Sequence, residues 1–241
     1  MSFDLERIVP ELLSPDDPLE RDTLELHRER YRFAARFVGG RPALDIACGV
    51  GYGSAMLAEG GAASVVGVDV SDDALAHARA NYARPGVAFV NADAASFVPD
   101  GPVTAAVSLE TIEHLADADA FVRRLAALVG PGGMVVGSVP ITLSTDVNPY
   151  HVHDFTAARF RRLFASSGLE VVDALMQRQP FSPIQLLRLR SGREISRRDY
   201  GMRKHLTRYY ATHPHMLLRR ITTTLRHGFC NKYLVLAGRR R

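Results

Sequence analysis

The sequence predicts an α/β protein with an open, largely parallel sheet, and three observations support this fold class. An apolar run at 43–47 leads through a glycine-rich loop into a helix-like segment. Apolar strand-like runs then alternate with helix-like segments along the chain, and acidic residues end three successive runs. Strands that alternate with helices of this length form parallel sheets, whose ligands bind beyond the carboxyl ends of the strands.

Local signals justify the elements in order. An apolar stripe from Leu24 to Phe37 predicts a first helix at 22–37. Ser71 precedes two acids, which is a helix-start signal, and the run Gly130–Gly133 is a helix stop followed by a turn. We expect further helices near 53–60, 72–83, 117–129 and 156–167, and strands near 43–47, 64–69, 87–91, 103–109, 133–139, 169–176 and 232–237, the last of them antiparallel.

Composition and pattern divide the chain into three regions. Residues 1–41 form a helical lead-in, residues 42–177 with 232–241 form the core, and residues 178–231 form a basic insert before the last strand. No apolar run approaches the roughly 20 residues that span a bilayer. The N-terminus has no basic-then-apolar signal, and the two cysteines suit a reducing compartment. We therefore expect a cytoplasmic protein without a membrane span.

The net charge of +4 conceals an asymmetry along the chain. Residues 177–241 hold 16 of the 30 Lys and Arg but only two acids, Glu194 and Asp199. Such segregation indicates a surface for an anionic partner, and the alternative is a solvated, Arg-rich helix face. The insert also contains aromatic residues, which together with Arg suit contact with sugar, phosphate or nucleic acid, or a homodimer interface. These residues are Phe181, Tyr200, Tyr209, Tyr210 and Phe229.

The loop after the first strand is the most informative local motif. It reads D-x-x-x-G-x-G-x-G, with Asp45 followed by Gly49, Gly51 and Gly53. Glycine permits a sharp turn and the close approach of a ligand, and the N–H groups that begin the next helix favour negative charge. Dinucleotide-binding enzymes have a glycine-rich loop too, but the acid ahead of the glycines argues against that class.

Three acids, Asp45, Asp69 and Asp93, end three successive strands and face one crevice of the expected sheet. With the glycine loop, this combination resembles class I S-adenosylmethionine-dependent methyltransferases over about residues 26–176. The resemblance implies that the loop holds the methionyl part of the cofactor, with Asp45 supporting its amino group. It also implies that Asp69 takes the ribose hydroxyls and that Asp93 faces the adenine amino group. The implied cofactor-contacting residues are Asp45, Ala47, Cys48, Gly49, Gly51, Asp69, Val70, Asp93, Ala94 and Leu109.

Two carboxylates and a histidine follow the fourth strand, as Glu110, Glu113 and His114. At helical spacing these side chains can converge on one face, where carboxylate oxygens and an imidazole can share a cation. The alternative is that they cap a helix or order a loop without a metal. A second cluster, Asn148-Pro149-Tyr150-His151-Val152-His153-Asp154-Phe155, follows the fifth strand on the same side of the sheet.

Together the two clusters resemble the magnesium site of small-RNA 3′-end 2′-O-methyltransferases, and a related site of ubiquinone-pathway O-methyltransferases. The resemblance implies that the metal ligands are Glu110, Glu113, His114 and His151. A divalent ion, Mg²⁺ by this resemblance, holds two adjacent hydroxyls and lowers the pKa of the attacking one. A histidine then takes the proton, with His153 as the first candidate and His114 as the second.

The segment from His27 to Ala34 and the Asn148–Phe155 cluster also resemble motifs of bacterial polysaccharide and sugar methyltransferases. Within that group they resemble the mycobacterial methylmannose-polysaccharide 1-O-methyltransferase type. The resemblance implies O-methylation of a sugar or short glycan such as a mannoside, with Tyr31 and Tyr150 near the acceptor. The alternative for Tyr31 is a core position in the first helix.

Three other functions stay open. The first is 2′-O-methylation of RNA, which the basic insert favours but which no recognisable RNA-binding module accompanies. The second is methylation of a catechol or, without a metal, of a small-molecule or sugar amine. The third is a cofactor-binding regulatory protein without catalysis, against which the intact set of Asp45, Gly49, Gly51, Asp69 and Asp93 argues.

Overall fold

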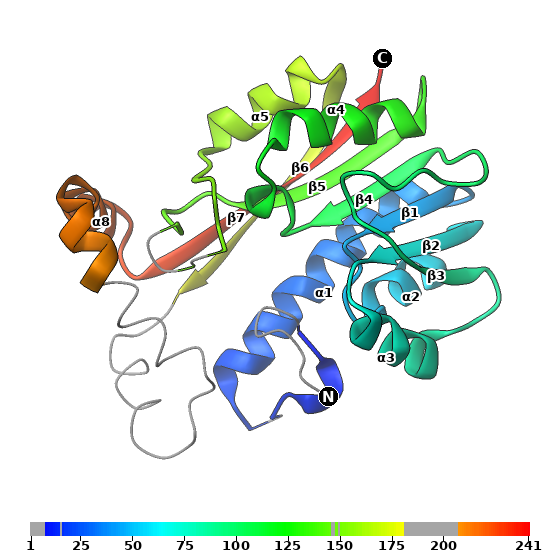
Figure 1. Ribbon diagram of the computed structural model, residues 1–241, viewed down its shortest axis with the longest axis horizontal. Coiled ribbons are helices and arrows are strands. Elements are labelled where there is room, and N and C mark those ends of the chain that lie inside the picture. The colour runs from blue at the N-terminus through cyan, green and yellow to red at the C-terminus, as the bar shows by residue number, and fades with distance from the viewer. Residues whose placement is uncertain (1–7, 15, 146–147, 149, 181–206) are drawn as a thin grey trace.

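The computed structural model describes residues 8–14, 16–145, 148, 150–180 and 207–241. Seven strands form one sheet in the order β3-β2-β1-β4-β5-β7-β6 (Figure 1). The first five strands pair in parallel, and β7 is antiparallel to both of its neighbours. The predicted α/β sheet with an antiparallel last strand is therefore confirmed. The strands are β1 (Pro42–Ile46), β2 (Ser64–Asp69), β3 (Val87–Asn91), β4 (Ala105–Leu109), β5 (Met134–Pro140), β6 (Leu169–Pro180) and β7 (Cys230–Arg240).

Helices cover both faces of the sheet: α1, α2 and α3 lie on one face, and α4 and α5 on the other (Figure 1). Because strand side chains alternate between faces, Leu44 and Ile46 pack toward α4 and α5, whereas Ala43 packs toward α1. The helices are α1 (Pro18–Val38), α2 (Tyr52–Glu59), α3 (Asp72–Tyr82), α4 (Ala118–Val129), α5 (Ala157–Ser166) and α8 (Pro214–His227), with short 3₁₀ turns η1 (Pro10–Leu12) and η2 (Ile112–His114).

The helix-start residues are those that the sequence favours. Ser71, Asp117 and Thr156 each accept a hydrogen bond from a backbone N–H three residues later, at α3, α4 and α5. The first helix begins at Pro18, four residues before the predicted start. Proline suits the first helical position, because its missing N–H would have no partner there.

The strands on either side of the basic insert are longer than the predicted strands 169–176 and 232–237. β6 continues to Pro180 and β7 begins at Cys230, because the hairpin pairing extends over Arg178–Lys232 and Gln179–Asn231. Residues 207–212 and α8 are helical. The predicted roles of Phe181 and Tyr200 lie outside the described residues.

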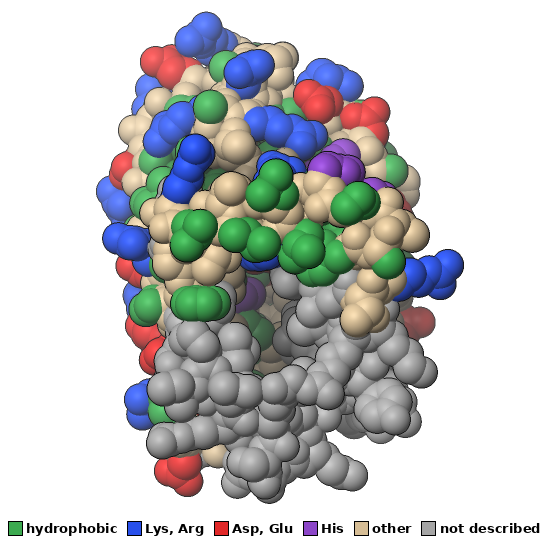
Figure 2. Space-filling view, turned by 90° about the vertical axis from the view of Figure 1, so that its left-hand side faces the viewer, with side chains coloured by type: hydrophobic (Ala, Val, Ile, Leu, Met, Phe, Trp, Pro, Cys, Tyr) green, Lys and Arg blue, Asp and Glu red, His purple; other side chains and the backbone are tan. Residues whose placement is uncertain are grey.

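One side of α8 exposes a stripe of apolar residues. Figure 2 faces the end of the molecule that carries α8, and hydrophobic side chains gather there with Lys and Arg around them. The stripe consists of Leu217, Leu218, Ile221 and Leu225, which are 44%, 64%, 47% and 81% exposed.

In the described part of the chain, no helix combines the length and the apolar character that crossing a membrane requires.

Two glycines of the motif, Gly51 before α2 and Gly53 in its first turn, are required by close packing. A Cβ on Gly53 would lie 1.9 Å from Cζ of Tyr31, and a Cβ on Gly51 would lie 2.6 Å from Cβ of Ala78. Gly51 also has a φ of +87°, a backbone conformation that other residues rarely adopt. The second and third glycines of the motif therefore let α1 and α3 approach the loop.

We expect Gly53→Ala to destabilise the fold by about 1–3 kcal/mol, because the added methyl group overlaps the buried ring of Tyr31. Urea denaturation measures this change. Gly101→Ala is the matched control, since Gly101 is exposed and no atom lies within 4 Å of its added Cβ. Equal stability of the two variants would contradict this expectation and show that the Tyr31 ring can move aside without a loss of free energy.

Candidate functional site

The glycine loop lies at the carboxyl end of β1, beside the end of β2. Cys48 N–H donates to the carbonyl of Val68 at 3.0 Å. Gly49 N–H donates to one carboxylate oxygen of Asp69 at 2.8 Å, and Ser71 N–H donates to the other at 2.9 Å. Asp69 therefore ties the loop to the turn before α3. The position that the sequence predicts for a ribose-binding acid lies directly at the loop.

Asp45 is fully buried beneath this loop. Ser54 Oγ donates to it at 2.7 Å, and the hydroxyl of Tyr31 donates at 3.3 Å. Burial raises the pKa of Asp45 to about 7, although both hydrogen bonds oppose the shift. The carboxyl group is therefore poised to change its charge near neutral pH.

Tyr31 does not lie where the predicted acceptor contact requires. Its side chain is 6% exposed, it packs against Gly53, and its hydroxyl is directed at Asp45. The predicted contact of Tyr31 with the acceptor is therefore wrong. Tyr31 instead supports the glycine loop from its buried side. Its position on the buried face of α1 causes the difference, because that face packs on the sheet.

The other predicted cofactor residues line the same edge of the sheet. Asp93, after β3, is exposed, and its side chain accepts hydrogen bonds from the N–H groups of Ala95 and Ser96 at 2.8 and 3.2 Å. Ala47 has a φ of +61°, which is strained for a residue with a side chain. Of the remaining residues, Val70 is exposed, Ala94 is half-buried, and Cys48 and Leu109 are buried.

Glu113, His114 and His151 form a cluster at the carboxyl ends of β4 and β5. One ligand atom from each lies within 4.8 Å of the other two, which is a spacing that suits a shared ion. The two imidazole rings meet edge to face with centroids 4.6 Å apart. Glu113 is fully buried, and both histidines are half-buried.

Backbone hydrogen bonds hold the two halves of this cluster together. The carbonyl of Glu113 accepts the N–H groups of Val152 and His153 at 2.9 and 3.3 Å. Nδ1 of His114 lies 3.1 Å from the carbonyl of Tyr150, to which only a protonated Nδ1 can donate. The neutral ring of His114 therefore carries its lone pair on Nε2, the atom suited to a metal.

Glu110 is not part of this cluster. Its carboxylate accepts from Ser138 Oγ at 2.7 Å and lies 3.7 Å from a guanidinium nitrogen of Arg30. The predicted convergence of all three residues on one helix face is wrong, because only Ile112–His114 are helical and Glu110 precedes them with a φ of +53°. This left-handed conformation directs Glu110 toward α1 and β5.

Two further predicted residues lie next to the cluster. Nε2 of His153 lies 3.3 Å from the carbonyl of Ala116, so this nitrogen carries the proton. His153 thus has its lone pair on Nδ1. Tyr150 is 54% exposed, and its carbonyl contacts His114.

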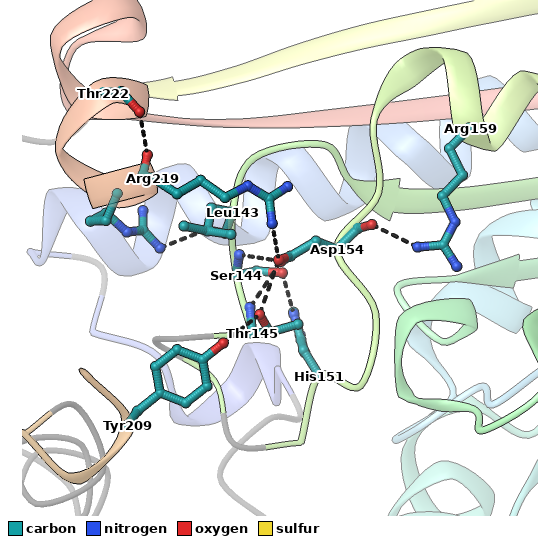
Figure 3. Close-up of polar contacts among 10 residues, drawn as sticks. Leu143, Ser144, Thr145, His151, Asp154, Arg159, Tyr209, Arg219 and Thr222 are labelled. Atoms are coloured by element: carbon teal, nitrogen blue, oxygen red, sulfur yellow. Dashed lines mark hydrogen bonds and ion pairs between the residues drawn. The ribbon is translucent and has the colours of Figure 1, made fainter. Parts of the chain in front are cut away.

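The structure adds residues that the sequence patterns did not single out. Ser144 Oγ lies 2.8 Å from Nδ1 of His151 (Figure 3). Asp154 contacts the backbone of Ser144, and Arg30 is fully buried against Glu110. Only Asp154 had a signal in the sequence, as an acid three residues after His151.

The donor set of the cluster fits a divalent cation. Imidazole nitrogen suits borderline ions such as Zn²⁺ or Fe²⁺, whereas Mg²⁺ and Mn²⁺ prefer oxygen. The buried carboxylate of Glu113 supplies the negative charge that such an ion requires. One carboxylate with two imidazoles leaves coordination positions for other ligands.

Comparisons with known proteins agree with the fold and the position of the glycine loop. A family model described as a methyltransferase domain matches residues 43–133. A Mycolicibacterium smegmatis protein named "probable S-adenosylmethionine-dependent methyltransferase" is 34% identical over 176 residues, covering 70% of this chain and 66% of that protein. A ubiquinone biosynthesis O-methyltransferase of Neisseria meningitidis is 30% identical over 158 residues, covering 63% of this chain and 61% of that protein.

A solved structure has the same architecture. The magnesium protoporphyrin IX methyltransferase from Synechocystis with bound SAH matches with a TM-score of 0.62 and 16% identity, covering 95% of this chain and 90% of that one. At this identity the likeness shows the fold alone. This chain spans less than two thirds of the length of the two curated relatives above. From the matched domain, the relatives and the fold together, we conclude that the chain carries a methyltransferase domain of the class I S-adenosylmethionine-dependent family.

Proposed function

We propose that this protein transfers a methyl group from S-adenosylmethionine to a hydroxyl of a sugar or short glycan, with a divalent metal ion at Glu113, His114 and His151. The observation that carries the proposal is the convergence of these three side chains at the end of β4. β4 pairs directly with β1, whose end carries the glycine loop. A methyl donor in the loop and a hydroxyl at the cluster would therefore be neighbours.

The cofactor would lie along the ends of β1, β2 and β3. In this proposal Asp45, Ala47, Cys48, Gly49 and Gly51 hold its methionyl part. Asp69 takes the ribose hydroxyls, because its carboxylate lies at the end of β2 directly against the loop. Val70, Asp93 and Ala94 surround the adenine, and Leu109 contacts the cofactor from the end of β4.

The acceptor would bind between the cluster and the basic insert. The exposed ring of Tyr150 is available to stack on a sugar ring. Nδ1 of His153 can take the proton of the attacking hydroxyl, because Nε2 donates to Ala116. If His114 binds no metal, its Nε2 can do so instead. Holding the hydroxyl in line with the methyl group supplies much of the acceleration.

A bound divalent ion, Mn²⁺ or Mg²⁺, supplies the polarisation that makes an alcohol a nucleophile at neutral pH. Glu113 and the two histidines would hold it. Glu110, one of whose carboxylate oxygens contacts both Ser138 and Arg30, can join as a further oxygen ligand only by turning toward the cluster. Two imidazoles and one carboxylate favour a borderline ion, and an additional carboxylate would favour Mg²⁺ or Mn²⁺.

A second candidate acceptor is a small catechol. A catechol also presents two adjacent hydroxyls to a metal, and the similarity to an O-methyltransferase of ubiquinone biosynthesis favours it. Both candidates share transfer to oxygen and dependence on a divalent ion.

Labelled-methyl transfer to mannosides, other short glycans, catechols, amines and RNA ends tests the proposal, with each acceptor assayed with a chelator and after Mn²⁺ or Mg²⁺ is restored. We expect transfer to a sugar that the chelator abolishes and the metal restores. Metal-dependent transfer to catechols alone would select the second candidate. Transfer that the chelator leaves unchanged, or transfer only to RNA or an amine, would contradict the assignment of the cluster.

We expect Glu113→Gln to lower transfer by about 100-fold or more, since the amide cannot supply the charge that a divalent ion requires. Cofactor affinity, measured by calorimetry, should stay within about twofold of wild type. Glu170→Gln, an exposed change on β6, is the control. A parallel loss of cofactor affinity would show that Glu113 has a structural role.

We expect cofactor binding to release protons near neutral pH. The pKa of Asp45 is raised to about 7 by burial, and the positive amino group of the cofactor would lower it again. At pH 7 binding should release about half a proton, so that affinity rises from pH 6 to pH 7 and levels off above. Calorimetry in two buffers of different ionisation enthalpy measures the release. Asp45→Asn should remove it, whereas the exposed control Asp100→Asn should not.

A further inference from the structure

We infer that Asp154 is a positioning residue, which sets the orientation of His151 through Ser144 and links the proposed metal site to α8. The inference rests on the proposed function, because it concerns His151 as a metal ligand. Asp154 lies at the end of the 141–156 segment, and its side chain is 12% exposed.

The carboxylate of Asp154 binds Ser144 and Thr145, which lie ten and nine residues earlier in the chain. One oxygen accepts the N–H groups of Ser144 and Thr145 at 2.9 and 3.1 Å (Figure 3). The other accepts the hydroxyl of Thr145 at 3.0 Å. A largely buried carboxylate with three such donors holds the backbone at Ser144 in one conformation.

Ser144, whose backbone Asp154 holds, in turn orients the ring of His151. Its hydroxyl lies 2.8 Å from Nδ1 of the ring, which is the nitrogen away from the proposed metal position if Nε2 is the ligand. Metal-binding histidines are usually oriented by a hydrogen bond at the other nitrogen, and loss of such a partner typically weakens metal binding by 10- to 100-fold. Ser144 is 7% exposed, so water cannot easily replace it.

Residues of the basic insert also contact Leu143, Thr145 and Asp154. Arg219 of α8 lies 3.3 Å from Asp154, and Arg220 donates to the carbonyl of Leu143 at 2.7 Å. The hydroxyl of Tyr209 lies 3.4 Å from that of Thr145. Figure 3 shows these contacts converging on the turn that carries Ser144. The position of α8 and the orientation of His151 are therefore coupled through Asp154.

Mn²⁺ binding to the full-length protein, measured by electron paramagnetic resonance, tests the inference without depending on turnover. We expect Asp154→Asn and Ser144→Ala to weaken Mn²⁺ binding by about 10- to 100-fold. Ser144→Thr, which keeps a hydroxyl, should restore most of the affinity. Arg219→Gln should weaken binding by a smaller factor. Affinity for S-adenosylmethionine should be unchanged throughout, and Asp119→Asn, an exposed change in α4, is the matched control.

The outcomes separate this inference from the proposed function. Wild-type Mn²⁺ affinity in Asp154→Asn and Ser144→Ala would overturn the inference and leave the metal site standing. Equal losses of Mn²⁺ and cofactor affinity would show general loosening of the fold and would also overturn it. If the wild-type protein binds neither Mn²⁺ nor Mg²⁺, the proposed metal site fails, and the inference fails with it.

Discussion

The buried carboxyl group of Asp45 is the constraint on which the arrangement of this domain depends. A polar group without access to water is costly unless it is hydrogen-bonded, and its two partners come from different elements. Tyr31 reaches it from α1 and Ser54 from α2, while Asp45 itself belongs to β1. The lead-in helix, the first strand and the loop helix must therefore meet at one point. Gly53 makes this meeting possible, since any larger residue would occupy the space of the Tyr31 ring.

A second buried side chain, that of Arg30, connects α1 to the strands on the other side of β1. Arg30, one residue before Tyr31, is fully buried. Its guanidinium donates to Gln177 of β6 at 2.7 Å, lies 4.3 Å from the ring centre of Tyr233 on β7, and approaches Glu110 after β4. Arginine can satisfy an amide, an aromatic face and a carboxylate together, because its planar group is both a fork of donors and a stacking surface. The helix that supports the loop thus also positions Glu110, which precedes the cluster of Glu113, His114 and His151.

The two halves of the site are joined mainly by backbone. The carbonyl of Glu113 accepts two N–H groups of the 150–153 segment, and its carboxylate lies in the cluster. Left-handed backbone at Ala47 and Glu110 marks the ends of β1 and β4, where loops turn sharply away from the sheet. Strained residues of this kind persist only where the surroundings hold them, and here both lie beside the proposed cofactor and acceptor.

The sequence by itself determined the α/β sheet, its antiparallel last strand, and the acids and glycines at the strand ends, because these features follow from local alternation and turn chemistry. It also brought His114 and His151 to one edge of the sheet, since neighbouring parallel strands end on the same side. Side-chain direction was decided only by tertiary packing. Glu110 turns to Arg30, which lies 80 residues earlier in the chain, and Tyr31 turns to Asp45 because α1 packs on the sheet. Ser144 and Arg219 acquire their contacts in the same way, from segments that no local pattern brings together.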